Sequence, residues 1–262
     1  MAERLRVITF DVYQTLIRYG EDLIREIGES ITRYFNEMGY SVESSVVTEY
    51  YKSIEREVRF DRRRGFVSTP PMENVRRLVL KICQRYGIPI NNRLTVDVQN
   101  VIADTVSNSR RVSAIEGVYE LLNMLKEDGW IIGIVSNVIF WPGRVTRSLM
   151  TRFGLWKFVT YGAFSDEVGY SKPHPVIFDT LVRTLTGERE PDIAVHVGDN
   201  FYEDFLGALM YGMVSVLYDP SGAFMKGEGS PHEVLKCRAY IVRNTKDVAT
   251  VAEEVSKCST TY

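Results

Sequence analysis

Short apolar runs alternate along this chain with longer stretches of helical periodicity. Strands are predicted where Val, Ile and Leu cluster, at 5–10, 130–135, 159–164, 193–197, 214–218 and 239–242. Helices are predicted where apolar residues recur every three or four positions, at 116–127, 142–153, 175–185, 203–211 and 246–256. Near-continuous apolar strands with helices between them are typical of a parallel sheet covered on both faces. The pattern therefore predicts an α/β fold with a doubly wound, Rossmann-like sheet.

The stretch 18–111 has only the helical pattern. Apolar residues repeat at one-turn spacing over 23–34 and 47–54, and Thr69 is a candidate N-cap before a proline-initiated helix that ends at Gly87. A mostly α-helical insertion is therefore expected within the sheet-forming chain. The predicted domains are an α/β core formed by 1–17 and 112–262, and a helical domain formed by 18–111.

Composition and charge narrow the classes of function. The chain has 262 residues, with 32 Lys and Arg against 34 Asp and Glu, so its formal net charge is −2. Proteins that coat nucleic acid are usually basic, and we therefore expect no nucleic-acid partner. The apolar runs are much shorter than the roughly 18 to 20 residues that cross a bilayer, so no membrane segment is expected.

The cysteines and the N-terminus suggest a compartment. Cys83, Cys237 and Cys258 are too few and too widely spaced for a disulfide framework or a zinc site. The first predicted strand begins at residue 5, which leaves no room before it for a signal peptide. We therefore expect a reduced, cytoplasmic protein.

Polar and charged residues stand after the ends of four predicted strands. They are Asp11, Tyr13 and Thr15 after 5–10, Ser136 and Asn137 after 130–135, Lys172 after 159–164, and Asp199 and Asp204 after 193–197. The carboxyl ends of parallel strands meet at one edge of a sheet, which is where such folds bind their ligands. These residues are therefore expected to meet in one pocket.

Such a pocket would hold three carboxylates, those of Asp11, Asp199 and Asp204. Like charges at close range raise one another's pKa, and a divalent cation relieves that repulsion. Clustered carboxylates with carbonyl oxygens suit Mg²⁺. Lys172 and nearby hydroxyls would then hold the anionic group of a small substrate, and a carboxylate can act as a covalent nucleophile. Any one of these aspartates alone would equally suit a turn or a helix cap.

As a set, these residues resemble the four motifs of the haloacid dehalogenase-like hydrolase superfamily. FDVYQTL is similar to its first motif, IVSN to its second, SKPHPVIF to its third and HVGDNFYEDFLGALMYGM to its fourth, in the family's order. One branch of the superfamily carries a helical cap domain between motifs one and two, and 18–111 resembles that cap.

The resemblance implies a mechanism. Asp11 would attack the substrate and form an aspartyl intermediate that water hydrolyses. Mg²⁺ would be held by Asp11, Asp199 and the backbone carbonyl of Tyr13, while Asp204 would act through a water or orient Lys172. The implied phosphate-binding residues are Thr15, Ser136, Asn137 and Lys172.

Tyr13 departs from the phosphatase pattern. Phosphatases of the family carry an Asp there, which protonates the leaving alcohol and then activates water. A phenol with an ordinary pKa of about 10 is a poor base at neutral pH. Tyr at this position is instead typical of the metal-independent 2-haloacid dehalogenases, which have Gly in place of Gln14 and a Ser-Asn pair in place of Gly198-Asp199.

Three functions remain open. We favour Mg²⁺-dependent hydrolysis of a small phosphomonoester, slowed by Tyr13, because Asp199 and Asp204 would repel the carboxylate of a haloacid. The alternatives are 2-haloacid dehalogenation and a phosphate-binding or regulatory role on an impaired hydrolase fold. The pattern identifies neither the substrate nor the oligomeric state.

Three further features have two interpretations each. An arginine of the basic run 56–64 would suit a phosphate or carboxylate, although such a run is more often a solvated helix end. His196 is expected to pack within its strand. Phe140 and Trp141 either wall the pocket or pack in the core.

Overall fold

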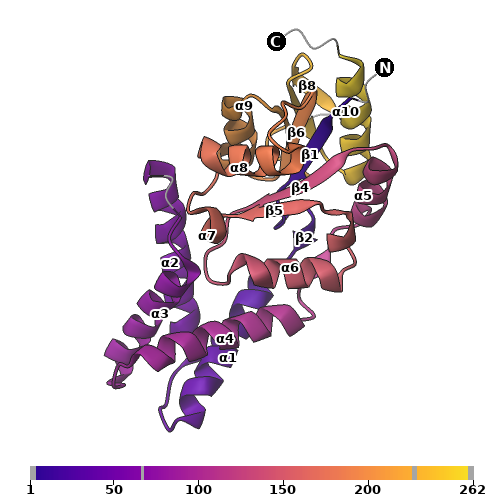
Figure 1. The fold of residues 1–262 in the computed structure, drawn as a ribbon. Helices are drawn as coiled ribbons and strands as arrows, with labels where there is room; N and C mark the ends of the chain where they lie inside the picture. Colours follow the sequence, from indigo (N-terminus) through magenta and orange to yellow (C-terminus); the bar gives the residue numbers. More distant parts are fainter. Residues whose placement is uncertain (1–3, 66–67, 226–228, 259–262) are drawn as a thin grey trace.

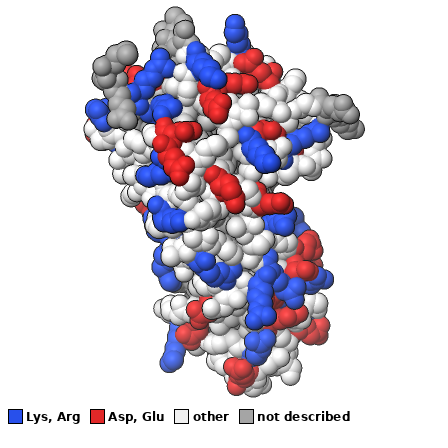
Figure 2. Space-filling model, turned by 90° about the vertical axis from the view of Figure 1, so that its right-hand side faces the viewer, with Lys and Arg blue, Asp and Glu red and all other residues white. Residues whose placement is uncertain are grey.

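A computed structural model describes residues 4–65, 68–225 and 229–258. Figure 1 shows a sheet flanked by helices, with a separate group of helices extending from one of its edges. Lys and Arg lie interspersed with Asp and Glu on the face shown in Figure 2, as the near-zero net charge implies. The predicted α/β class is confirmed.

The main sheet has seven strands, six of them parallel. Their order is β5 (Tyr161–Phe164), β4 (Ile131–Ser136), β1 (Arg6–Phe10), β6 (Ile193–Gly198), β7 (Val214–Tyr218), β9 (Ala239–Val242) and β8 (His232–Leu235), the last antiparallel to β9. The first strand of the chain is thus central, between β4 and β6. This order places the chain's switch from one side of the sheet to the other at the end of β1.

Both faces of the sheet are buried, which explains why its strands are almost continuously apolar. In β1, Val7 joins one buried cluster, while Ile8 and Phe10 join the cluster on the other face. Helices α8 (Pro175–Thr186) and α9 (Gly207–Tyr211) lie on one side of the sheet in Figure 1. Helices α5 (Val118–Glu127) and α10 (Thr245–Lys257) pack against each other on the opposite side.

The residues between β1 and β4 form the extending group of helices. These are α1 (Glu21–Glu37), α2 (Ser44–Gly65), α3 (Pro71–Tyr86) and α4 (Asn92–Asn108). The chain enters and leaves the group through β2 (Ile17–Arg18) and β3 (Ser113–Ala114), which pair antiparallel beside the predicted boundaries. The division into two domains stays a prediction. Among the described helices, none has the length and apolar character that crossing a bilayer requires.

Some local predictions were wrong. The N-cap of α3 is Pro70 rather than Thr69, and strand β5 begins only at Tyr161, after a 3₁₀ turn, Trp156–Phe158. The helix predicted at 203–211 begins earlier, with a π-helical turn, Phe201–Leu206, before α9. The reason is that the Asn200 side chain accepts hydrogen bonds from the backbone N–H groups of residues 202 and 203, which caps this turn.

Elements outside the predicted set include one short helix and one edge strand. The helix is α7 (Ser165–Val168), whereas α6 (Gly143–Arg152) was predicted only one residue longer at each end. The edge strand is β8, His232–Leu235, which was not predicted either.

The expectation of unpaired, reduced cysteines was wrong for two of the three. Cys237 and Cys258 form a disulfide across 21 residues, with their Cα atoms 6.3 Å apart. Cys237 lies in the turn between β8 and β9, and Cys258 follows α10, which packs on β9. This packing brings together two ends that the sequence separates. Cys83 is a buried free thiol.

Candidate active site

Three adjacent strands deliver their polar residues to one edge of the sheet. Ser136 ends β4, Asp11 directly follows β1, and Asp199 directly follows β6. The ends are in register, since the backbone N–H of Asp11 donates to the carbonyl of Val197 at 2.9 Å. Parallel pairing therefore brings together groups that are up to 188 residues apart, as predicted.

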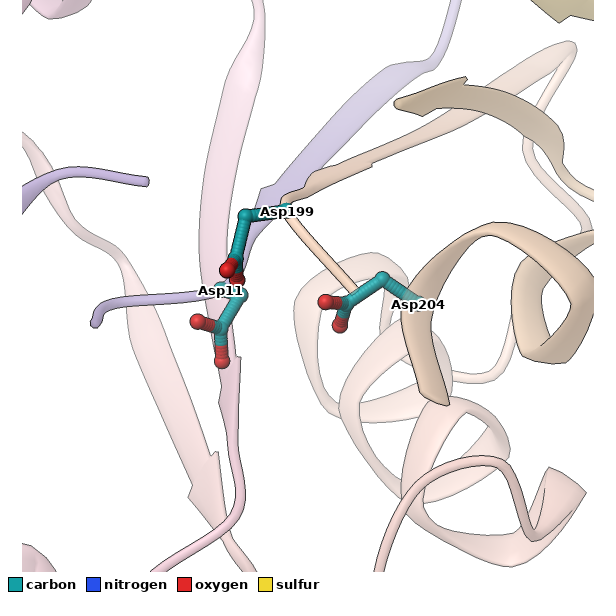
Figure 3. Close-up of side chains that lie close together, drawn as sticks. All are labelled: Asp11, Asp199 and Asp204. Carbon is teal, nitrogen blue, oxygen red and sulfur yellow. The ribbon is translucent and has the colours of Figure 1, made fainter. Parts of the chain in front are cut away.

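The three aspartates meet as the sequence pattern predicts. One carboxylate oxygen from each of Asp11, Asp199 and Asp204 lies within 4.8 Å of the others. Figure 3 shows all three carboxyl groups directed toward a common space, Asp204 from the turn after β6. Such a set of oxygen ligands suits a hard divalent cation.

Lys172 lies at the centre of the charges. Its side chain is 1% exposed, and Nζ donates to Asp11 Oδ1 at 2.6 Å, Asp204 Oδ1 at 2.5 Å and the carbonyl of Val135 at 2.9 Å. Burial disfavours its charge, but the two carboxylates outweigh burial and hold the pKa of Lys172 above its usual range. The lysine therefore stays charged and pairs with two of the three carboxylates.

The third carboxylate, that of Asp199, is not balanced in this way. Burial, followed by the charges of Asp11 and Asp204, raises the pKa of Asp199 to about 8. Burial also raises the pKa of Asp11 to about 6, against the opposing effect of Lys172. The site thus carries more carboxylate than its lysine can neutralise. Mg²⁺ fits this deficit, because a divalent cation favours the ionised form of all three groups.

Asp204 is the most firmly held of the three. Burial opposes its ionisation, but the charge of Lys172 and the hydrogen bond to His196 outweigh burial and lower the pKa of Asp204 to about 2. Its Oδ2 accepts from the backbone N–H of Asn200 at 3.0 Å. A Cβ atom at Gly198 would lie 2.2 Å from its Cγ, so only glycine leaves Asp204 room here.

His196 packs within β6 as expected, and it also holds Asp204. Its Nε2 lies 3.1 Å from Asp204 Oδ1, and its Nδ1 lies 2.8 Å from the Thr9 hydroxyl. Burial lowers the pKa of His196, so the ring is neutral at pH 7. An ionised Asp204 can only accept, so Nε2 carries the ring proton and donates.

Two buried hydroxyls at the edge of the sheet, Thr15 Oγ1 and Ser136 Oγ, neither donate nor accept a hydrogen bond within the described part of the chain. Unsatisfied buried hydroxyls are costly, and an anion bound at this edge would satisfy them. Both residues were predicted to bind phosphate, and their state fits such a ligand.

Asn137 was predicted to bind substrate, but its side chain already has partners in the protein. Its Oδ1 accepts from the backbone N–H of Lys172 at 2.9 Å, and its Nδ2 donates to the Lys172 carbonyl at 3.1 Å and to Glu203 at 2.9 Å. These bonds fix the loop that carries Lys172. The direct role in substrate binding stays a prediction.

The hydroxyl of Tyr13 is hydrogen-bonded to side chains other than the carboxylates. It lies 2.9 Å from Thr146 Oγ1 and accepts from the indole N–H of Trp141 at 2.6 Å. Burial holds its pKa well above the usual range, so the phenol does not ionise at neutral pH. Gln14, the next residue, has a φ of 65°, which explains why Gly suits this position in the dehalogenase pattern.

The carboxylates open into a small pocket between the sheet edge and the helical group. Its volume is about 120 Å³, which suits a small ligand. The helical segment contributes Tyr19, Tyr51, Glu55, Arg59 and Arg62. The two tyrosines, Glu55, Asn200 and Glu203 were not predicted as site residues. Only the last two had a signal, because they lie within the fourth motif. Phe140 and Trp141 do line the pocket.

Comparisons with known proteins agree with the fold. The family model for "Haloacid dehalogenase-like hydrolase" matches residues 72–218. This chain is therefore a hydrolase of the α/β class with an aspartate cluster at its sheet edge. It belongs to the haloacid dehalogenase-like hydrolase family.

One relative and one solved structure cover most of the chain, and a second relative covers about a third of it. "Haloacid dehalogenase-like hydrolase domain-containing protein 3" of Mus musculus is 29% identical over 225 residues, which are 83% of this chain and 84% of that protein. "Glyceraldehyde 3-phosphate phosphatase" of Methanothermobacter thermautotrophicus is 35% identical over 96 residues, 36% of this chain and 39% of that enzyme. The crystal structure of a 2-haloacid dehalogenase from Pseudomonas syringae pv. Tomato has a TM-score of 0.66 at 18% identity, over 95% of this chain and 98% of that one. That structural likeness concerns the fold alone.

Proposed function

We propose that this hydrolase cleaves small phosphomonoesters with the help of Mg²⁺ and an aspartate nucleophile. The observation that carries the proposal is the three-carboxylate cluster, in which Lys172 pairs with Asp11 and Asp204 while Asp199 has no ion pair among the described residues. A phosphomonoester needs counter-charge during transfer, and this cluster would hold the ion that supplies it. The archaeal phosphatase relative supports the same reaction class.

Asp11 would attack phosphorus with one carboxylate oxygen, and the alkoxide would leave with the electrons of the broken P–O bond and take its proton from water. The Asp11 Oδ1–Lys172 hydrogen bond fixes the carboxyl group, which orients the other oxygen for attack. Thr15 and Ser136 would donate their free hydroxyls to the phosphoryl oxygens. Water would then hydrolyse the aspartyl phosphate and release phosphate.

The metal would be held by Asp11, Asp199 and the Tyr13 carbonyl, with Asp204 reaching it through water. When bound, Mg²⁺ offsets charge on the transferring phosphoryl group. Asp204 keeps Lys172 in place by its 2.5 Å bond to Nζ. The residues present therefore provide both a nucleophile and counter-charge.

Tyr13 would make turnover slow. Its hydroxyl is bound to Thr146 and Trp141, so it is not placed to protonate the leaving alcohol or to activate water. We therefore expect activated esters, whose leaving group needs no proton, to be cleaved faster than alkyl phosphates.

Phosphate release from a panel of small phosphomonoesters, in Mg²⁺ and in EDTA, tests the proposal. We expect release in Mg²⁺ and at least a tenfold fall in EDTA, because the carboxylates then lose their counter-charge. Chloride release from a 2-chloro acid is measured on the same protein. Chloride release in EDTA without phosphate release in Mg²⁺ would show a dehalogenase instead.

Replacing Tyr13 by Asp should raise phosphatase activity by about tenfold or more, because it introduces a general acid and base of the usual pKa range. The control is Tyr13→Phe, which removes the hydroxyl and leaves the ring, and which we expect to behave like the unmodified protein. Initial rates with an alkyl phosphate measure both. Activity that exists only in Tyr13→Asp would instead favour a phosphate-binding or regulatory role.

A further inference from the structure

The pocket that the carboxylates line also contains a buried arginine, two of whose nitrogens have no acceptor among the described residues. Arg62 of α2 is 2% exposed and lines the pocket that Asp11 and Asp199 also line. Its Nη2 donates to the carbonyl of Val138, which follows β4. Its Nε and Nη1 have no acceptor among the described residues. One of the three Arg62 nitrogens is therefore hydrogen-bonded within the protein.

This state is energetically unusual. A buried guanidinium normally has all its donors satisfied, and an unsatisfied buried charge is costly. Burial, despite the nearby charge of Glu203, lowers the pKa of Arg62 to about 10, so it remains a cation at neutral pH. Nε and Nη1 lie on different edges of the planar guanidinium, and each edge also includes Nη2. The N–H of Nη2 that does not donate to Val138 can therefore form, with either Nε or Nη1, a two-donor fork that matches a carboxylate or phosphate.

Carboxylates of the protein near Arg62 are engaged elsewhere. Glu55 accepts two hydrogen bonds from Arg59, at 3.1 Å and 2.8 Å. Glu203 accepts from Asn137 at 2.9 Å. Arg59 is therefore already paired with an acid, whereas Arg62 is not hydrogen-bonded to either acid.

The pocket wall is held against the core at this point. Tyr51 of α2 stacks on Phe140 with ring centroids 3.9 Å apart, and the Asn74 side chain donates to the carbonyl of Ile139 at 2.8 Å. These contacts all reach the segment that follows β4. They fix Arg62 relative to the carboxylates without using its free donors.

We propose that Arg62 binds a second anionic group of the substrate. The substrate class is then a small phosphomonoester that also carries a carboxylate or a second phosphate, and this assignment of class rests on the proposed phosphatase function. The phosphate would lie at the aspartate edge, and the second group would accept from Nε or Nη1 of Arg62 together with the remaining N–H of Nη2. The small pocket restricts both groups to one short molecule.

Equilibrium binding separates this subsite from catalysis. Calorimetric titrations in Mg²⁺ compare two matched pairs of probe ligands. They use the Asp11→Asn variant, so that the probes are not hydrolysed during the titration. The first pair is 3-phosphoglycerate and sn-glycerol 3-phosphate, which differ by a carboxylate. The second pair is propane-1,3-diol bisphosphate and 3-hydroxypropyl phosphate, which differ by a phosphate. In one pair, we expect the probe with two anionic groups to bind about 10- to 100-fold more tightly than its partner with one anionic group.

Adding Arg62→Gln to Asp11→Asn should abolish that difference. The affinity for the probe with one anionic group should stay within about twofold of its value in Asp11→Asn alone. Arg62→Lys, which keeps the charge and loses the fork, should retain part of it. Arg56→Gln is the matched control, because Arg56 is an exposed arginine of the same helix. Binding of the singly anionic probes also reports whether each variant is folded.

The outcomes are distinct. Equal affinities within both pairs, or equal losses for both members in Arg62→Gln, would overturn the proposal and leave Arg62 as a structural contact to Val138. An Arg62-dependent preference in a protein that releases no phosphate would retain the anion subsite and contradict the phosphatase function. The pair that shows the preference identifies carboxylate or phosphate as the second group.

Discussion

Replacement of Asp11 by Asn lowers the rate of phosphate release by about 10³-fold or more in our expectation, because it removes the nucleophile and the covalent route with it. The amide keeps the size of the side chain and can still accept from Lys172, whose Nζ lies 2.6 Å from Asp11 Oδ1. It also removes one of three mutually repelling charges. The melting temperature should therefore change little, and steady-state rates in Mg²⁺ measure the loss.

The matched control is Asp219→Asn. Asp219 is also a buried aspartate after a strand, β7, but its carboxylate accepts from loop N–H groups of residues 223 and 224. It lies outside the carboxylate cluster. We expect this variant to lose stability and to keep kcat. A rate for Asp11→Asn within about tenfold of the unmodified protein would exclude Asp11 as the nucleophile.

Replacement of Lys172 by Met should be the most destabilising single change in the site. The lysine is 1% exposed and bonded to Asp11 and Asp204, so its removal leaves buried carboxylates without their cation. Breaking a buried ion pair in this way costs about 3–5 kcal/mol. Urea unfolding at pH 8 in EDTA measures the change in the free energy of unfolding.

The pH dependence of that loss has a definite sign. Without Lys172, the folded-state pKa values of the remaining carboxylates lie above their unfolded values, so the folded state binds more protons. Stability then falls as pH rises from about 4 through the folded-state pKa values. Lys126→Met, at an exposed position of α5, is the control and should stay within about 0.5 kcal/mol. A similar, small loss in both variants would show that Lys172 does not balance the cluster.

The fold was predictable because the signals that specify it are local. Buried parallel strands are apolar at nearly every position, and 214–218 and 239–242 were predicted with the bounds that β7 and β9 have. The aspartate cluster was predictable for a related reason. Parallel strands end at the same edge, so Asp11 and Asp199 had to meet once the two strands were adjacent.

Contacts between distant side chains were not predictable in this way. Periodicity could not place Arg62 near Val138, 76 residues away, or show that two of its nitrogens are unpaired. The disulfide between Cys237 and Cys258 depends on how α10 packs against β9. For Tyr13, the sequence revealed an unusual residue, and the structure showed which groups hold its hydroxyl.

By itself, the sequence determined the α/β class, the positions of most strands and helices, and the set of residues at the sheet edge, because each depends on the local pattern of apolar and polar positions. The tertiary structure alone decided which of those groups are paired. Lys172 is bonded to Asp11 and Asp204, whereas within the described part of the chain Asp199 has no such partner and two nitrogens of Arg62 have no acceptor. Pairing depends on distances of a few ångströms between segments far apart in the chain, and only their packing sets those distances.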